Sequence, residues 1–224
     1  MEFYDVMRTT FSAREFTGDP LPDDTLFRIL NIARFAPSGG NRQGWHVLVV
    51  RDRATREAIA ALNAPTARRY MAQVHAGESP WNTIDPTTVD TVTIEQTRVP
   101  ARMTEPLLKA PVVLIICVDL KVVASTDQYL PRVGVVSGAS IYPFAWSILL
   151  AARQEGFGGT ITTLAIAQEP QLQTLLGIPA HVAVCAIMPL GRPVRQLKRL
   201  KRKPVSEFAM LERWGGPPLT AASR

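Results

Sequence analysis

The sequence predicts a single α+β domain built around a central sheet. Segments with helical periodicity alternate along the chain with short runs rich in β-branched residues. Two of these runs, residues 112–118 and 181–188, are almost wholly apolar, which is typical of strands buried on both faces. The chain has 224 residues, 46% hydrophobic and 20% charged, which is enough for one sizeable core.

The first half is expected to hold two helices and one strand. Residues 22–33 begin with a proline and two aspartates, which suit a helix N-terminus. Apolar residues follow at the i, i+3, i+4, i+7 spacing of an amphipathic helix: Leu26, Ile29, Leu30 and Ala33. Residues 46–50 are predicted to form a strand, and residues 54–62 a second helix capped by Asp52.

The second half repeats this alternation. The buried strand at residues 112–118 is followed by a long helix from about residue 133. Residues 158–164 are threonine-rich and strand-like. A short helix at residues 168–176, closed by Gly177, then leads to the last buried strand.

Residues 133–152 form a run of twenty uncharged residues, long enough for a membrane helix. Serines, glycines and a proline dilute this run. A helix that is apolar all round in a protein of this size belongs more often to a core or a subunit interface. We therefore expect it to lie in a homodimer interface, and we expect no membrane partner.

Two segments do not join the alternating pattern. Residues 63–106 contain five prolines and little periodicity beyond a helical turn around residues 67–74. Segments of this length are usually lids or binding loops, so we expect a lid in which Tyr70 and Trp81 face the substrate. The extension at residues 192–224 has Phe208, Leu211 and Trp214 at helix-like spacing, and these apolar residues are expected to pack against another surface.

The formal net charge of +6 arises from one short stretch. Residues 192–203 contain seven basic residues and no acid, and the rest of the chain has 18 basic and 19 acidic residues. Without interleaved aromatic residues, a solvated tail or an anchor for one phosphate group is favoured over nucleic-acid binding. The N-terminus lacks the apolar region of a signal peptide, and Cys117 and Cys185 sit in apolar runs as expected of buried thiols. A cytoplasmic location is expected.

Several common catalytic arrangements are not supported. The three histidines have no zinc-binding spacing, and no GxSxG nucleophile motif occurs. Residues 156–159 lack the third glycine of a dinucleotide-binding loop and follow a helix rather than a strand. Residues 39–44 lack the lysine of a phosphate-binding P-loop. No metal site is expected.

Two pieces of sequence suit an anionic, amide-rich ligand. Ser12 and Arg14 stand two residues apart, so in an extended segment they face the same way and can both donate to a phosphate. Residues 36–45 form a turn with free backbone N–H groups, two amide side chains and an aromatic residue, which suits a flat heterocycle. Taken singly, the first piece is more typical of a surface arginine beside a capping serine, and the second is also typical of a plain helix–strand connection.

Taken together, these motifs resemble the FMN-dependent nitroreductase family. The motifs are Ser-x-Arg-x-Phe near the start, Ala-Pro-Ser-x-x-Asn-x-Gln-x-Trp after the first helix, a glycine-rich turn after the long apolar helix, and Arg-Lys-Pro near the end. The resemblance covers nearly the whole chain. It implies an α+β sandwich with a mostly antiparallel sheet flanked by helices, in a homodimer that binds FMN at its interface.

The resemblance also implies site residues and an activity. The cofactor-binding residues would be Ser12, Arg14, Pro37, Ser38, Gly39, Asn41, Gln43, Gly159, Thr160 and Arg202. FMN would take hydride from NAD(P)H and pass electrons to a nitroaromatic, a quinone or a related small acceptor. No catalytic side chain is expected, because the flavin itself carries the hydride chemistry.

The sequence departs from the family pattern at two places. Phe11 stands where the first arginine of the N-terminal motif is expected, which leaves Arg8 or the hydroxyl of Thr10 to take its role. Thr160 is followed by Ile-Thr-Thr rather than the Pro-x-Glu-Gly of the classical nitroaromatic-reducing branch, so the acceptor stays open. A non-enzymatic flavin carrier and a basic nucleic-acid binder are the alternative functions.

Overall fold

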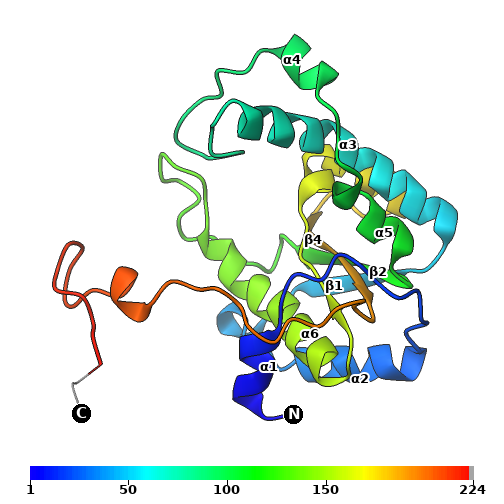
Figure 1. Ribbon diagram of the computed structural model, residues 1–224, viewed down its shortest axis with the longest axis horizontal. Coiled ribbons are helices and arrows are strands. Elements are labelled where there is room, and N and C mark those ends of the chain that lie inside the picture. Colours follow the sequence, from blue (N-terminus) through cyan, green and yellow to red (C-terminus); the bar gives the residue numbers. More distant parts are fainter. Residues whose placement is uncertain (222–224) are drawn as a thin grey trace.

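The computed structural model describes residues 1–221 and has the expected α+β architecture (Figure 1). Its sheet contains four strands: β1 (Trp45–Val50), β2 (Val112–Asp119), β3 (Gly158–Gly159) and β4 (Val182–Gly191). Their order is β1-β2-β4-β3, and every neighbouring pair is antiparallel. The prediction of a mostly antiparallel central sheet is therefore confirmed.

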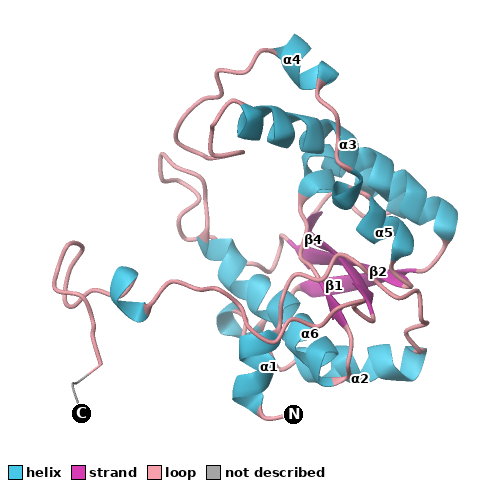
Figure 2. Cartoon of the chain, in the orientation of Figure 1, coloured by secondary structure: helices cyan, strands magenta, loops and turns pink. Residues whose placement is uncertain are grey.

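Helices cover both faces of this sheet (Figure 2). One layer holds α1 (Phe3–Thr9), α2 (Asp23–Ala33) and α6 (Tyr142–Gln154), and the other holds α3 (Arg53–His75), α5 (Glu105–Lys109) and α7 (Glu169–Leu176). The short helix α4 (Thr91–Gln96) packs on α3.

The position of β2 between the two helical layers explains why its sequence is apolar throughout. Val112, Leu114 and Ile116 belong to the core shared with α2 and α6. The intervening residues, including Ile115 and Cys117, belong to the core shared with α3, α5 and α7. Because successive side chains of a strand point to opposite faces, a strand between two helical layers needs apolar residues at every position.

The second helix is longer than the sequence predicted. Asp52 does cap it, accepting a 2.7 Å hydrogen bond from the Thr55 backbone N–H, but α3 continues past residue 62 to His75 in spite of Pro65. Beyond the proline, Ala67, Met71 and other residues are buried. The free energy gained from this burial offsets the loss of the backbone hydrogen bond that a proline removes from a helix interior. The first part of the segment predicted as a lid, residues 63–75, therefore belongs to α3.

The long helix expected at residues 133–152 is shorter. Residues 133–135 lie in a loop, Val136–Ser140 form a 3-10 turn, and α6 begins only at Tyr142, with Pro143 in its first turn. Glycine and serine are poor helix formers, whereas proline is well tolerated at the first turn. No helix within residues 1–221 is long and apolar enough to cross a membrane.

Other boundaries also differ. The N-terminal helix α1 was not predicted, because its seven residues show no clear apolar stripe. Of residues 158–164 only Gly158 and Gly159 form a strand, joined by an isolated bridge at Thr162. The helix before Gly177 is confirmed as α7, and Gly177 has the positive φ of 65° that suits a glycine at a helix end.

The chain beyond about residue 197 extends away from the body (Figure 1). Within this tail Phe208 is exposed, and Trp214 is 94% exposed. The expected packing of these aromatic side chains therefore does not occur against the body of the same chain.

The segment after α3 is organised around one carboxylate. Glu78 accepts 2.7 Å hydrogen bonds from the Thr88 backbone N–H, from the Thr88 hydroxyl and from the Thr87 hydroxyl, and a 3.2 Å bond from the Gln73 amide. The Thr88 N–H contributes most to lowering the pKa of Glu78 from 4.5 to about 2. The carboxylate thereby ties the chain at residues 87–88 to the end of α3.

We expect Glu78→Gln to loosen this segment, because an amide cannot accept bonds on both of its terminal atoms. Hydrogen exchange at the Thr88 amide should become about tenfold faster at pH 7, given the strength of bonds to charged acceptors. The matched control is Glu95→Gln on α4, whose side-chain carboxylate makes no hydrogen bond within residues 1–221.

The same hydrogen-bond network makes the stability of residues 78–88 depend on pH. The folded-state pKa of Glu78 is depressed, so its stabilising contribution is present above about 4.5 and is lost as the pH falls toward about 2. Protection of residues 78–88 in the wild-type protein should fall across this window and stay level in Glu78→Gln. Equal pH profiles for the two proteins would contradict this role.

Candidate active site

The N-terminal motif lies beside the short strand β3. Ser12 forms a parallel bridge with Gly159, and the Ala13 N–H donates a 2.9 Å hydrogen bond to the Gly159 carbonyl. On the side facing β4, residue 159 must be a glycine, since a Cβ there would collide with the Pro189 carbonyl oxygen and the Leu190 side chain. The predicted residues Ser12 and Gly159 are therefore brought together, and their neighbours Arg14 and Thr160 line one cavity.

The start of the basic tail runs along the same motif. The Val194 N–H donates to the Glu15 carbonyl at 3.1 Å, and the Gln196 side-chain amide donates to the Thr9 carbonyl at 2.9 Å. Arg192 is already paired with Asp19 at 3.3 Å. Arg202 lies farther along, exposed, donating only to the neighbouring Lys201 carbonyl within residues 1–221. The basic run thus begins beside Thr9 and Glu15–Thr17, which flank Ser12 and Arg14.

The two proposed substitutes for the missing arginine differ in availability. The Thr10 hydroxyl is buried and donates its hydrogen to the Val6 carbonyl at 2.7 Å, so it has no second hydrogen to donate to an anion. Arg8 is exposed on α1, with its guanidinium carbon 5.7 Å from the centre of the Tyr4 ring. Phe11 instead packs against the small cluster around Phe16.

The turn at residues 37–43 lies elsewhere. Its Gly39 N–H donates a 3.0 Å bond to the Ser140 hydroxyl, just before α6, and the Ser38 hydroxyl accepts from the Gln43 N–H at 2.9 Å. Asn41 and Gln43 adopt positive φ angles of 52° and 50°, which are strained for residues other than glycine and occur often at functional sites. Pro37 and both amide residues are exposed.

The turn and the N-terminal motif contact opposite ends of α6. Ser140 precedes the first turn of this helix, whereas Arg153 in its last turn donates a 3.1 Å bond to the Thr9 hydroxyl. A helix of 13 residues is roughly 20 Å long at 1.5 Å per residue. No described cavity is lined by residues from both pieces.

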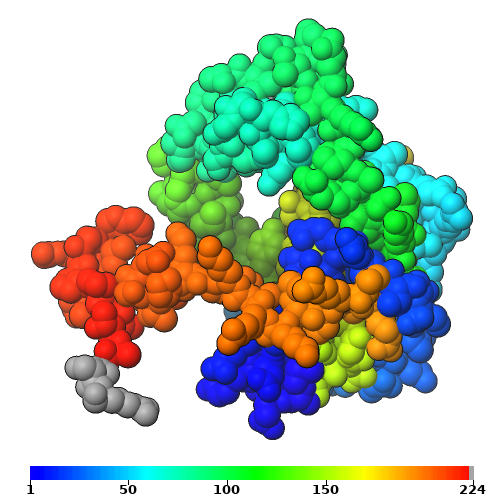
Figure 3. All heavy atoms as spheres, in the orientation of Figure 1, coloured from blue at the N-terminus to red at the C-terminus, as the bar shows by residue number. Residues whose placement is uncertain are grey.

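Two adjoining cavities lie on the α3 side of the sheet. The first, of about 400 Å³, contains Arg14, Arg102 and Thr160 among its lining residues. The second, of about 820 Å³, contains Trp81 and Tyr142. Tyr70 lines both, as do Thr163 and Leu164. The space-filling view shows the molecule hollowed between the end of α3 and the start of α6 (Figure 3).

The two aromatic residues predicted to face a substrate therefore meet at one cavity. Trp81 is fixed by two contacts: its backbone N–H donates to the Gln73 side chain at 3.2 Å, and the Arg69 guanidinium carbon lies 4.4 Å from its ring centre. Such a cation–π contact restrains the ring. Trp81 remains partly exposed rather than becoming a core residue.

An irregularity in β4 shapes the second cavity. The β2–β4 register passes from Ile116 opposite Ala186 to Cys117 opposite Val184, which leaves Cys185 as an extra residue. Bulges of this kind redirect a side chain, and Cys185 lines the cavity. Burial raises the pKa of the Cys185 thiol to about 12, with smaller contributions from Cys117 and Glu169, so this thiol stays protonated at neutral pH.

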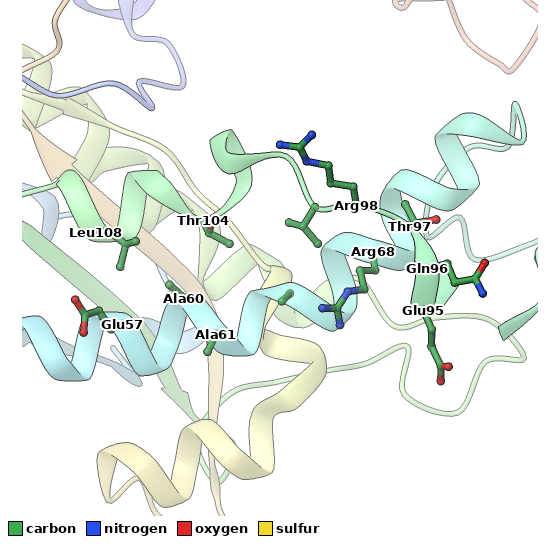
Figure 4. A pocket seen from close by; sticks show the side chains of 12 residues that line it. Glu57, Ala60, Ala61, Arg68, Glu95, Gln96, Thr97, Arg98, Thr104 and Leu108 are labelled. Carbon is green, nitrogen blue, oxygen red and sulfur yellow. The ribbon is translucent and has the colours of Figure 1, made fainter. Parts of the chain in front are cut away.

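A separate groove runs along the outside of α3 (Figure 4). Ala60 and Ala61 form part of its floor, Arg68 and Arg98 come from its two sides, and Ala64 also lines it. The stripe of residues 61, 64 and 68 lies on the face of α3 opposite Thr66 and Tyr70. None of the predicted site residues lines this groove.

Several cavity residues were not singled out from the sequence. Arg102 and Thr66 occupy the segment whose structure was expected to be irregular, and Tyr142 lies in what was predicted as a helix interior. The continuous helix α3 that positions Thr66 was hidden by Pro65. Only the pair Thr66 and Tyr70, four residues apart, offered a local signal.

A family model described as "Nitroreductase family" matches residues 7–192, most of the chain. The chain belongs to the nitroreductase family. Among curated relatives, human iodotyrosine deiodinase 1 is 26% identical over 209 residues, covering 92% of this chain and 68% of that protein. A Thermus thermophilus protein named NADH dehydrogenase is 26% identical over 227 residues, covering 89% and 90%.

Solved structures share the nitroreductase fold. An iodotyrosine deiodinase bound to FMN and 3-iodo-L-tyrosine has a TM-score of 0.68 at 19% identity, covering 95% of this chain and all of that one. The NADPH:FMN oxidoreductase from Vibrio harveyi, in complex with NAD⁺, has a TM-score of 0.66 at 19% identity, covering 95% and 77%. At these identities the likeness supports the fold alone.

Proposed function

We propose that this nitroreductase-family chain is an FMN-dependent oxidoreductase that takes hydride from NAD(P)H and reduces a small organic acceptor. The observation that carries this proposal is that the N-terminal segment contacts both Gly159 and the start of the basic tail, and that Arg14 and Thr160 line one cavity. FMN-binding relatives of the same fold add support. We further propose that the protein acts in the cytoplasm.

The residues present fit the phosphate of FMN. Ser12 and Arg14 supply a hydroxyl and a guanidinium, whereas Arg202 lies on the tail that leaves the body and does not line this cavity. The cavity lined by Arg14 also contains Arg102 and no carboxylate from residues 1–221. A dianionic phosphate suits such a set, because arginines match phosphate oxygens in both charge and geometry.

A different set of residues would hold the flavin ring and the ribityl chain. Gly159 presents only backbone to its surroundings, and Thr160 borders the first cavity. The turn at residues 37–43 offers the Asn41 and Gln43 amides, which now bond to each other at 3.1 Å and could exchange this bond for a heterocycle. Because this turn lies at the other end of α6, we infer that a second copy of the chain contributes it.

When bound, FMN supplies the two-electron chemistry, and for a quinone the balance is NAD(P)H + H⁺ + quinone → NAD(P)⁺ + hydroquinone. The chain contributes binding, orientation and exclusion of water. No acid–base side chain is assigned, because the lining of the second cavity offers only neutral hydroxyls and a protonated thiol within residues 1–221.

A homodimer is the proposed assembly. Tyr142 and Trp146 remain partly exposed on α6, although its other face is buried in the core. The tail projects Phe208 and the almost fully exposed Trp214 away from its own body. Exposed apolar patches of this kind mark protein–protein contacts, and a second copy offers the matching turn at residues 37–43.

The absorption spectrum of the purified protein tests the cofactor. We expect a flavin spectrum, release of FMN on denaturation, and oxidation of NADH or NADPH when a quinone or a nitroaromatic is supplied. Bound FMN without turnover of any donor would favour the alternative of a flavin carrier. Colourless protein with salt-sensitive DNA binding would favour a nucleic-acid binder instead.

Arg14 and Arg202 are predicted to bind the same FMN phosphate. Replacing either by Ala should weaken FMN binding roughly tenfold to a hundredfold, because bonds to charged groups contribute about 1.5–3 kcal/mol. Fluorescence titration of the apoprotein with FMN measures this change. Arg213→Ala, in the tail beyond the basic run, is the control. Wild-type affinity in Arg202→Ala would leave the basic run as solvated surface.

The dimer is tested by sedimentation equilibrium at micromolar concentration. We expect a dimer for the wild-type protein and dissociation with loss of FMN for Trp146→Glu, which places a charge in an apolar contact. Leu175→Glu, on the exposed side of α7 in the other helical layer, is the control and should stay dimeric. A wild-type monomer that retains FMN would refute both the dimer and the shared site.

A further inference from the structure

Strand β4 has a partner strand along nearly its whole length on one side, but only along its second half on the other. β2 pairs with residues 182–190, whereas β3 and the isolated bridge at Thr162 meet β4 only at residues 187, 190 and 191. Within the described residues, no strand pairs with the second edge of residues 182–186. The backbone groups on this edge need other partners, because a buried N–H or C=O without one is costly.

Two side chains of α7 take the place of the missing strand. The Glu169 carboxylate accepts a 2.5 Å hydrogen bond from the Val184 N–H, and the Gln173 amide donates a 3.0 Å bond to the Val182 carbonyl. Residues four apart lie on one face of a helix, and residues two apart in a strand direct their backbone groups to the same edge. The helix therefore offers an acceptor and a donor at the spacing that the strand requires.

Glu169 holds β4 at the point where its register changes. Val184 lies opposite Cys117 and directly precedes Cys185, the extra residue of the bulge. The Cys185 carbonyl in turn accepts a 3.4 Å hydrogen bond from the Tyr142 hydroxyl of α6. The bulge is thus fixed by one hydrogen bond from each of the two helical layers.

The Glu169 carboxylate also joins two walls of the second cavity. β4 contributes three consecutive residues to the lining: Ala183, Val184 and Cys185. The segment at residues 163–167, which leads into α7, forms another wall, and its first two residues also line the first cavity. Glu169 follows this segment closely and lines neither cavity. Its bond to Val184 therefore ties the two walls together without a contact to a ligand.

We propose that Glu169 is a positioning residue of the acceptor site. By holding the β4 bulge against the segment at residues 163–167, it fixes the width of the second cavity and hence the affinity for the electron acceptor. Gln173 holds Val182, which lines neither cavity, so it stabilises the same edge without shaping the site. This inference rests on the proposed oxidoreductase function.

Steady-state reduction of menadione by NADH or NADPH tests this role. Glu169→Ala removes the acceptor of the Val184 N–H, so the KM for menadione should rise about tenfold, while kcat and FMN content stay within about twofold. Glu169→Gln keeps an oxygen that accepts the same bond, and its KM should stay within about threefold of wild type. Gln173→Ala is the matched control: it loses a bond between the same helix and the same strand, and it should keep the wild-type KM.

Labelling of Cys185 gives a readout that does not depend on turnover. The chain has two cysteines, and Cys117 is fully buried, so N-ethylmaleimide should react first at Cys185 in the cavity wall. A loosened bulge in Glu169→Ala should speed this reaction about tenfold, because a buried thiol reacts through local opening. Gln173→Ala should leave the rate close to that of wild type. Mass spectrometry of the labelled peptides identifies the reacting cysteine.

A further variant separates reach from charge. Glu169→Asp keeps the carboxylate but is one methylene shorter, so it should raise the KM and the labelling rate as Glu169→Ala does. If Glu169→Ala does not fold, the comparison of Glu169→Asp with Glu169→Gln carries the same test.

The outcomes separate this role from the proposed function. A protein that oxidises neither NADH nor NADPH would refute the oxidoreductase function, while labelling would still test the hold on the bulge. Wild-type KM and wild-type labelling in a folded Glu169→Ala or Glu169→Asp would overturn the role of Glu169. Equal effects in Gln173→Ala would also overturn it, because they would show a general loosening of β4. A loss of kcat at unchanged KM would do the same.

Discussion

The antiparallel pairing of β2 with β4 is the interaction on which the rest of the structure depends. β2 is buried on both faces, and this burial requires the two helical layers. Both ends of β4 then shape the site. Its bulge at Cys185 opens the wall of the second cavity, and its end at Leu190 and Gly191 pairs with β3, which in turn holds the N-terminal motif.

Most of the fold was predictable because its signals are local. The apolar strand at residues 112–118 and the glycine at residue 177 report burial and backbone conformation directly. The errors arose where tertiary contacts override local preference. Pro65 suggested a break that the burial of α3 prevents, and the uncharged run at residues 133–140 reflects a solvent-facing loop and turn rather than a helix.

The site was predictable only as separate motifs. The short motifs at Ser12–Arg14 and at residues 37–43 follow from residue chemistry, but their distance across α6 does not. The unpaired Thr66 hydroxyl was invisible for another reason: a threonine in a sequence gives no sign of whether its hydroxyl finds a partner. That property depends on the segments that pack on α3, among them α5, α7 and the turn at residues 164–168, which come together only in the fold.

The two cavities differ in the charge of their linings. Arginines border the first, which suits an anionic cofactor, whereas the second has an uncharged lining within the described residues. If the turn that completes the cofactor site comes from a second copy, FMN binds the dimer more tightly than the monomer. Linkage then requires that FMN strengthen the dimer by the same free energy by which the dimer strengthens FMN binding. Assembly and cofactor loading become one equilibrium, in which a free monomer has neither a complete cofactor site nor a reduced flavin to expose to solvent.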